Sequence, residues 1–259
     1  MSSPSTLYNS RIPELKTQIY KSFTKGLSQR NQASSSIIFF RADDIGVPSR
    51  QFREMVSLFI RYKIPLCLAV VPSWLSQTRL HALQQITGTT SQFCWHQHGW
   101  QHKNYELSGK KQEFGSERSE EHIHQDLVNG QKRLSNLLED QFSPFFTPPW
   151  NRCNTSTLSL LEKLEYKGVS RSSGATPVSP GNLPDFQINV DLHTRKERNP
   201  EDSLHHLLEE IRDSVSSGIT GVMLHHQRMN DNAIHLLDMF LQVLAEFREV
   251  RPVHFEEMI

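Results

Sequence analysis

From Ile37 onward the apolar residues form two kinds of pattern, which alternate along the chain. Short continuous apolar runs predict buried strands, whereas apolar residues that recur every three or four positions predict amphipathic helices. The apolar run Ile37–Phe40 is followed by a helical pattern over Ser49–Tyr62 and then by the run PLCLAVVP, which starts at Pro65. This order predicts a β-α-β unit.

The same alternation continues to the end of the chain. Five more strands are predicted at Phe93–His96, Phe145–Thr147, Gly168–Arg171, Phe186–Val190 and Gly221–His225. Helices are predicted over Trp74–Gln85, Glu120–Glu139, Ser156–Tyr166, Ser203–Ser216 and Ala233–Phe247. Strands that alternate with helices over one domain predict an α/β fold with a parallel sheet or barrel, whose site lies at the carboxyl ends of the strands.

Residues 1–35 differ from the rest of the chain because they are polar. They contain one possible helix, Pro13–Leu27, and end in a linker of Ser, Gln and Asn residues. We expect an appendage over 1–35 and a catalytic domain over 36–259. No apolar run is long enough for a signal-peptide core or a membrane span, which predicts a cytoplasmic protein.

Charge and cysteine content narrow the range of partners. Lys plus Arg and Asp plus Glu both number 28, so the formal net charge is zero and no basic run predicts a nucleic-acid or lipid surface. The oligomeric state stays open. The cysteines are three and scattered, which agrees with a reducing compartment, and Cys67 and Cys94 are expected in the core.

The chemically reactive residues follow the predicted strands. They are Asp43 and Asp44, His98 and His102, the segment TPPWNR from Thr147, Asp191, and His225 with His226. Each has a simpler interpretation: the aspartates can cap a helix, the TPPW segment can form a rigid turn, and a histidine can end a strand. Their occurrence together at strand ends favours a shared site.

His98 and His102 are the best candidates for metal ligands, but their spacing alone is weak evidence. With 13 histidines in 259 residues, roughly 0.6 pairs would fall at this spacing by chance. Two imidazoles and one carboxylate make a three-ligand site that leaves a position open for water or substrate. That arrangement is typical of catalytic metal sites.

Five motifs, RADDIG, HGWQH, TPPWN, VDLH and MLHH, occur in the order found in the polysaccharide deacetylases, the NodB-homology or carbohydrate esterase 4 group. The sequence resembles this family from about Ile37 to the end of the chain, and most of all a divergent bacterial branch with PPWN and LHH motifs. The resemblance implies a distorted (β/α)7 barrel, a divalent metal such as Zn²⁺, and removal of an N-acetyl group from a sugar.

The resemblance also implies roles for individual residues. Asp43 matches the general base, and Asp44 matches the metal ligand that acts with His98 and His102. Asp43 is therefore expected to take a proton from water beside the metal.

The later motifs supply the other half of the reaction. The resemblance places the substrate and the oxyanion at Pro149–Asn151, with the backbone N–H of Trp150 as donor and its ring as a wall of the sugar pocket. His225 matches the general acid and Asp191 the carboxylate that orients it, with His226 as the alternative acid. Neighbouring residues of an extended segment face opposite ways, so only one histidine is expected to point into the site.

One position departs from the family pattern. Thr147 stands where the family has an arginine that orients the catalytic aspartate. Arg41 is the preferred substitute, because residues two apart in a strand point to the same side and Arg41 then lies beside Asp43. Arg152 and Arg171 are weaker candidates.

Three other polar features rank below these residues. His96 is expected to be a hydrogen-bonded strand residue, and His193 reaches the rim of the cleft in one of its interpretations. The loop Lys110–Ser119 folds over the site or holds substrate in one interpretation and is solvated in the other.

The leading hypothesis is a cytoplasmic, metal-dependent de-N-acetylase that acts on a small N-acetylated sugar or on a lipid- or nucleotide-linked precursor. One alternative is a hydrolase of another amide on the same fold, such as a ureide or cyclic imide. The other is a catalytically degenerate domain that binds a sugar or a partner protein.

Overall fold

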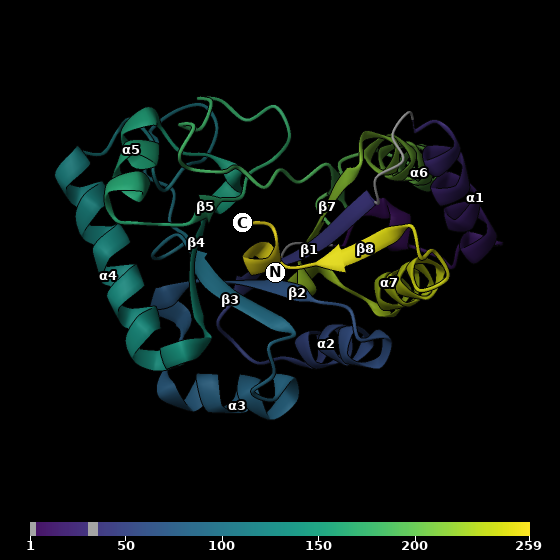
Figure 1. Cartoon of the computed structure of the whole chain (residues 1–259), viewed down its shortest axis with the longest axis horizontal. Coiled ribbons are helices and arrows are strands. Elements are labelled where there is room, and N and C mark those ends of the chain that lie inside the picture. The colour runs from purple at the N-terminus through teal and green to yellow at the C-terminus, as the bar shows by residue number, and fades with distance from the viewer. Residues whose placement is uncertain (1–3, 31–35) are drawn as a thin grey trace. The chain divides into compact units, whose positions relative to one another are not determined.

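The structure is a computed structural model that describes residues 4–30 and 36–259. In this part of the chain the α-helices are α1 Leu15–Ser28, α2 Arg50–Tyr62, α3 Gln77–Thr87, α4 Glu120–Leu138, α5 Thr155–Lys163, α6 Pro200–Ser217 and α7 Asp231–Leu244 (Figure 1). The strands are β1 Ser36–Ile45, β2 Leu66–Val70, β3 Phe93–His98, β4 Phe142–Thr147, β5 Gly168–Val169, β6 Val190–Asp191, β7 Ile219–Leu224 and β8 Val250–Val253.

Every predicted helix has a counterpart within a few residues, whereas the strands differ more. Strand β1 continues past Phe40 to Ile45 and so includes Asp43 and Asp44, and β5 ends at Val169. The sixth strand comprises only Val190–Asp191, because Asp185 and Ile188 form isolated bridges instead of a ladder. Strand β8 has no counterpart among the predicted elements. It has only four residues and contains Pro252, which cannot donate a ladder hydrogen bond and weakens a strand signal.

Local sequence explains where the helices begin. A Ser or Asn side chain caps each of the helices α2 to α7 by accepting a hydrogen bond from a backbone N–H in the first turn. Ser49, for example, accepts from the N–H of Phe52 at 3.0 Å. Helix α1 starts differently, because Glu14 before it is left-handed and makes no side-chain cap.

The chain is organised in two compact units. Unit 1 comprises the described residues up to Ala42 together with Ser49–Leu66 and Asn189–His254. Unit 2 comprises Asp43–Pro48, Cys67–Ile188 and Phe255–Ile259. Strand β1 supplies residues to both, since the boundary falls between its residues Ala42 and Asp43.

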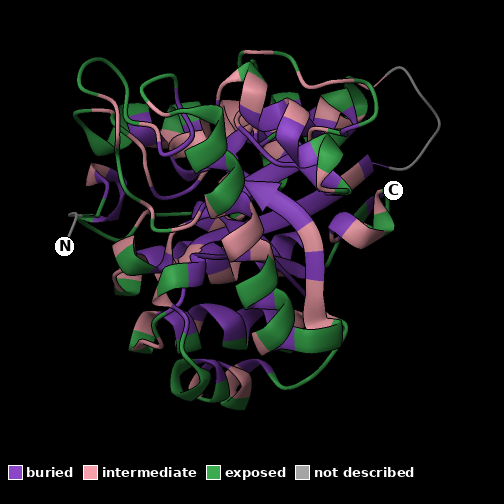
Figure 2. Cartoon of the chain, turned by 90° about the vertical axis from the view of Figure 1, so that its left-hand side faces the viewer, coloured by how far each residue is buried: buried purple, intermediate pink, exposed green. Residues whose placement is uncertain are grey.

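Unit 1 is built on parallel strands in the order β8-β1-β7-β6, with helices α1, α2, α6 and α7. Phe40 of β1 is fully buried, and its ring packs edge-on against Phe59 of α2 at 5.1 Å and Phe240 of α7 at 5.8 Å. Burying such a side chain stabilises the fold by about 1.5–3 kcal/mol. The strands in Figure 2 are mostly buried, whereas the helices alternate between buried and exposed residues.

The N-terminal helix packs into unit 1. Ile19 and Phe23 of α1 are fully buried, and a Cβ at Gly26 would lie only 2.6 Å from the carbonyl oxygen of Arg212 in α6. Figure 1 shows α1 and α6 side by side. The division into an appendage over 1–35 and a domain over 36–259 stays a prediction, and residues 1–3 and 31–35 lie outside the described part.

Unit 2 contains strands in the order β2-β3-β4-β5 and helices α3, α4 and α5. The register of β3 against β4 shifts between Trp95 and Gln97, after which His98 pairs with Thr147. Phe114, from the loop between β3 and α4, is fully buried in the core of this unit, where its ring meets Phe146 edge-on at 5.2 Å. The loop Lys110–Ser119 is therefore not merely solvated.

Candidate functional site

The three predicted metal ligands lie together in unit 2, at the carboxyl ends of two strands. Asp44 is the second-last residue of β1, His98 is the last residue of β3, and His102 follows four positions later. Asp44 Oδ1 lies 3.3 Å from Nε2 of His98 and 3.1 Å from Nε2 of His102. Ligand atoms in a tetrahedral zinc site are roughly 3.3 Å apart, so the three donors are spaced to hold one ion.

A backbone hydrogen bond sets the orientation of His98. Its Nδ1 lies 2.9 Å from the carbonyl oxygen of Thr147, and because a carbonyl only accepts, Nδ1 carries the proton. The Nε2 lone pair of the neutral ring then faces Asp44, as metal-binding histidines require. The donor set therefore fits a divalent metal.

The pKa values of the two histidines are shifted in opposite directions. Burial and the nearby His98 lower the pKa of His102 to about 4. Burial also acts to lower the pKa of His98, but the hydrogen bond that the protonated ring donates to Asp44 and the charges of Asp43 and Asp44 outweigh it, so this pKa lies above its usual value. Two imidazoles that share one carboxylate repel each other when both are protonated.

Left-handed backbone conformations cluster at this site. Asp44, His102, Trp150 and Asn151 have φ values of 62°, 57°, 56° and 59°. Such values are uncommon for residues other than glycine and cost of order 1 kcal/mol each. The surrounding contacts must therefore hold these residues in place.

The metal loop, which we define as Gly99–His102, is held by one buried carboxylate that the sequence did not indicate. Glu113 is fully buried and accepts hydrogen bonds from the backbone N–H groups of Trp100 (3.2 Å), Gln101 (2.6 Å) and His102 (3.1 Å). Burial raises the pKa of its carboxyl, although these hydrogen bonds oppose the shift. The loop Lys110–Ser119 thus contributes to the site by contacting the metal loop.

Gly99 allows this close contact. Its φ is 59°, and an added Cβ would lie 2.2 Å from Oε2 of Glu113 and 2.6 Å from the ring of Pro149. Pro149 of the third motif is buried beside the metal loop. No side chain larger than hydrogen fits here without displacing one of these neighbours.

Two tryptophans flank the ring of His102. The ring of Trp150 lies 4.5 Å from it between centroids, and the ring of Trp74, which follows β2, lies at 5.8 Å. Both tryptophans are half-buried. The third motif therefore reaches the candidate metal site through Trp150 and Pro149, and Asn151 adjoins them with its N–H bound to the carbonyl of Pro148 at 2.9 Å.

The side chains of His96 and Thr147 are hydrogen-bonded to each other. His96 is fully buried in β3, and its Nε2 lies 2.9 Å from the hydroxyl oxygen of Thr147 in β4. This confirms the expectation of a hydrogen-bonded strand histidine. Thr147 thus has two roles, since its carbonyl orients His98 while its side chain pairs with His96.

The three arginines proposed to replace the family's arginine have different surroundings. Arg171 is buried in unit 2 and bound to Asp185 at 2.7 Å and to the carbonyl of Pro177. Arg152 donates to the carbonyl of Lys111 at 3.3 Å. Arg41 is fully buried in β1 and donates to the sulfur of Met223 at 3.3 Å.

The motifs proposed for the acid lie in unit 1. Asp191 begins a tight turn, Asp191–Thr194, which we call the acid turn. Its carboxylate accepts from the N–H groups of His193 and Thr194, both at 2.9 Å, and from the Thr194 hydroxyl. Asp191 therefore stabilises the turn, and His193 is the residue that meets the last motif.

His193 is buried and accepts a hydrogen bond at Nδ1 from the backbone N–H of His225, at 3.1 Å. Burial, reinforced by the nearby His225, His226 and Arg228, keeps the pKa of His193 well below its usual value. The ring is therefore neutral. The ring of His193 lies beside that of Tyr8, with 5.6 Å between the ring centroids. The Tyr8 hydroxyl donates to the carbonyl of Leu192.

His225 and His226 have different environments. His226 is buried, and its ring meets Phe52 of α2 edge-on at 5.7 Å. His225, by contrast, is partly exposed. Only one of the two histidines is thus available to solvent.

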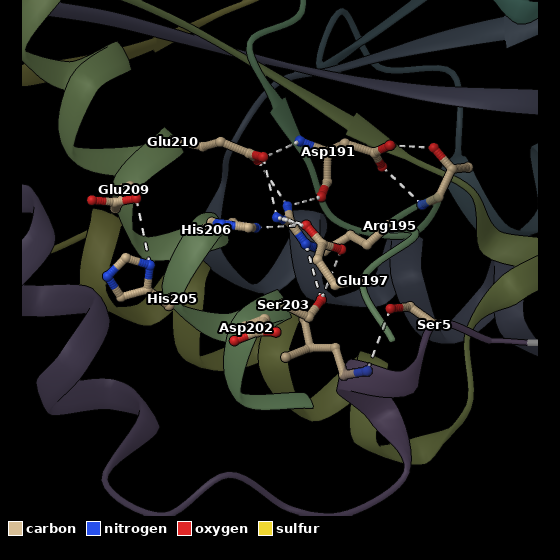
Figure 3. A network of polar contacts seen from close by, with 12 residues as sticks. Ser5, Asp191, Arg195, Glu197, Asp202, Ser203, His205, His206, Glu209 and Glu210 are labelled. Atoms are coloured by element: carbon tan, nitrogen blue, oxygen red, sulfur yellow. Dashed lines mark hydrogen bonds and ion pairs between the residues drawn. The ribbon is translucent and has the colours of Figure 1, made fainter. Parts of the chain in front are cut away.

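A buried guanidinium ties the acid turn to helix α6 (Figure 3). Arg195 donates to the carbonyl oxygen of Asp191 at 2.9 Å and to both carboxylate oxygens of Glu210 at 2.8 and 3.1 Å. It also pairs with Glu197 at 2.8 Å. No pattern in the sequence indicates that Arg195, Glu197 and Glu210 form this network.

The chain belongs to the polysaccharide deacetylase family, whose profile matches residues 31–169, more than half of its length. No curated protein matches its sequence. None of the helices in the described residues is long and apolar enough to cross a membrane.

Solved structures with a similar fold have low sequence identity. A protein from Mycobacterium smegmatis, named as a polysaccharide deacetylase, is 13% identical with a TM-score of 0.65, and the match covers 88% of this chain and 90% of that one. A family 4 acetyl xylan esterase from Clostridium thermocellum in complex with a cobalt ion is 12% identical with a TM-score of 0.53, over 86% and 89% of the two chains.

A family 4 pseudoenzyme from Bacillus anthracis is also similar, at 12% identity and a TM-score of 0.56, over 85% of this chain and 64% of that one. These likenesses confirm the predicted fold class, the distorted (β/α)7 barrel of the polysaccharide deacetylases.

Proposed function

We propose that this chain is a metal-dependent hydrolase that removes an N-acetyl group from a carbohydrate or a sugar-containing precursor. The observation that supports it most directly is the convergence of Asp44, His98 and His102 in a member of the polysaccharide deacetylase family. Asp44, His98 and His102 would hold a divalent ion, most simply Zn²⁺, which would polarise the amide carbonyl and lower the pKa of bound water.

Asp43 is the proposed general base. It is buried next to the ligand Asp44, and its charge acts on His98. Its carboxylate accepts a proton from the attacking water. Arg41 lies two positions earlier on β1, on the same side of the strand, which makes it our choice for the group that orients Asp43 in place of the family's arginine.

The third motif is proposed to bind the reacting amide. The backbone N–H of Trp150 donates to the oxyanion as negative charge develops there. The half-buried rings of Trp150 and Trp74 supply flat apolar faces for a sugar ring.

His225 is the proposed general acid, which protonates the leaving nitrogen. It is the more exposed of the two histidines, whereas His226 packs against Phe52. We propose that Asp191 acts on His225 indirectly, because its carboxylate holds the N–H of His193 and His193 in turn holds the N–H of His225.

Metal content is the first test. The wild-type protein and His98→Ala/His102→Ala are dialysed identically, and metal per chain is measured by plasma mass spectrometry. The matched control is His122→Ala/His124→Ala, which removes two exposed histidines of α4. About one divalent ion in the wild type and the control, and little in the first variant, is expected; no metal in the wild type, even with zinc supplied, contradicts the proposal.

Substrate screening follows. Acetate release is measured from small N-acetylated sugars and from nucleotide- or lipid-linked precursors, the compounds available to a cytoplasmic enzyme, a location that cell fractionation tests. Ring opening of ureides and cyclic imides is measured beside it, and activity in that assay alone identifies another amide hydrolase.

A catalytically inert binding domain is the second candidate. It is favoured by Thr147 in the place of the family's arginine and by the likeness to a pseudoenzyme. Asp43→Asn separates the two: an enzyme loses turnover while it keeps its metal, whereas a binding domain keeps both metal and ligand affinity and has no turnover to lose.

A further inference from the structure

The three consecutive N–H groups of the metal loop point at a single carboxylate from a distant part of the sequence. Glu113 binds Gln101 through Oε1 and both Trp100 and His102 through Oε2. Hydrogen bonds to an ionised acceptor are stronger than those between neutral groups. Glu113 thus binds the peptide that carries one of the three proposed ligands.

The position of Glu113 is itself fixed by the core. Phe114, the next residue, is fully buried, and its carbonyl oxygen accepts from the N–H of Asn154 at 2.9 Å. On the other side, the carbonyl of Glu113 accepts from Arg118, which is paired with Asp126 of α4 at 2.7 Å. The carboxylate therefore extends from a segment attached to α4 and to the start of α5.

We propose that Glu113 is a positioning residue for the metal centre. Its carboxylate holds the backbone of the metal loop so that His102, at a φ of 57°, turns its ring toward Asp44 and His98. This inference rests on the proposed metal site. Glu113 lies outside the group of three candidate ligands; it acts through the peptide of one of them and lowers the cost of ordering that ligand before an ion binds.

Metal affinity tests this role without any substrate. The dissociation constant for Zn²⁺ is measured by competition with a chelator for the wild type, Glu113→Gln and Glu113→Asp, with Glu121→Gln as a matched control on the exposed start of α4. An amide at 113 opposes one N–H with its own NH₂ group, and an aspartate is one methylene too short to reach all three. Each variant at 113 is expected to bind zinc at least about tenfold more weakly, and the control to bind as the wild type does.

Hydrogen exchange on the metal-free wild type provides a measurement that needs no variant. The amides of residues 100–102 are expected to be protected before zinc is added. Exchange at the rate of an unstructured peptide overturns the inference even if neither variant folds. So does a folded Glu113→Gln or Glu113→Asp protein with wild-type zinc affinity.

The two proposals fail in distinguishable ways. A wild type that binds no zinc refutes the proposed function, while exchange at 100–102 still reports whether Glu113 orders the loop. A wild type that binds zinc, with variants at 113 that bind equally well, leaves the function standing and refutes the positioning role.

Discussion

The metal loop of unit 2 and the acid turn of unit 1 are both short segments that carry proposed catalytic groups, but they are stabilised differently. One carboxylate, from Glu113, binds three successive N–H groups of the metal loop. The acid turn is held by Asp191 within it and by Arg195, which joins it to Glu197 and Glu210. A single carboxylate thus binds three N–H groups of the metal loop, while Gln97 Nε2 and the N–H of Ser73 donate to the carbonyl oxygens of Gly99 and Trp100. The acid turn instead has two side chains, Asp191 and Arg195, whose contacts overlap.

The largest expected effect is the loss of a metal ligand. Asp44→Ala removes the one carboxylate between two imidazoles, and the metal content is expected to fall from about one ion per chain to near zero. Plasma mass spectrometry measures it, with the exposed Asp140→Ala as control. Full metal content in Asp44→Ala shows that the ion binds elsewhere.

Next in size is the difference between the two adjacent histidines. His225→Gln is expected to lower kcat/KM by about 10²–10⁴-fold because the leaving nitrogen loses its acid, whereas His226→Gln keeps turnover within tenfold. Steady-state acetate release, at a zinc content matched between variants, provides the measurement. The opposite ranking assigns the acid to His226.

Removal of the Arg195 guanidinium, which binds the acid turn, tests the overlapping contacts there. Arg195→Ala leaves Glu210 and Glu197 without their buried partner. It is expected to lower the free energy of unfolding by about 3 kcal/mol. This value is at the low end for a buried ion pair because the Glu210 side chain is about one-third exposed. Urea denaturation measures it. Arg212→Ala, which breaks more exposed pairs on the same helix, is expected to cost less than about 1 kcal/mol.

Equal losses in the two arginine variants contradict the importance of burial in this network. If the two segments are independent, Arg195→Ala also keeps the zinc affinity of the wild type.

The smallest effect is a pH dependence. His193 is buried with a pKa far below its usual value, so below about pH 6.5 the unfolded chain binds a proton there that the folded protein does not. The contribution of His193 to the free energy of unfolding is therefore fully present above this pH. It decreases as the pH falls, by at most about 1.4 kcal/mol per pH unit for one proton.

Urea denaturation of the wild type and His193→Asn between pH 5 and 8 measures the slope. Asparagine can still accept from the N–H of His225 but does not titrate. The difference in stability between the two proteins is expected to shrink as the pH falls, and a constant difference rules out this contribution of His193.

Regular elements were predictable because their signals are local. Ser49 before a helical apolar periodicity indicates the start of α2, and the continuous apolar run after Pro65 indicates a buried strand. The grouping of Asp44 with His98 and His102 was predictable as well, because strand ends meet at one edge of a parallel sheet. The roles of these residues came from the family resemblance and stay predictions.

The features that could not be predicted depend on contacts between residues far apart in the sequence. Glu113 sits in a polar loop, and no pattern shows that its carboxylate binds the peptides of residues 100–102. The left-handed conformation of Trp150 is equally invisible, since that residue type rarely adopts it. His193 and Arg195 resemble ordinary loop residues until the fold surrounds them.

The glycine between His98 and Trp100 has a consequence for anyone who wishes to transplant this centre into another protein. A designer who grafts only two histidines four positions apart would omit the residue whose missing side chain lets Glu113 and Pro149 approach. The smallest portable module is therefore the pentapeptide HGWQH together with a buried acceptor for its amides and a carboxylate in the place of Asp44. A search for related centres would gain selectivity by requiring glycine after the first histidine.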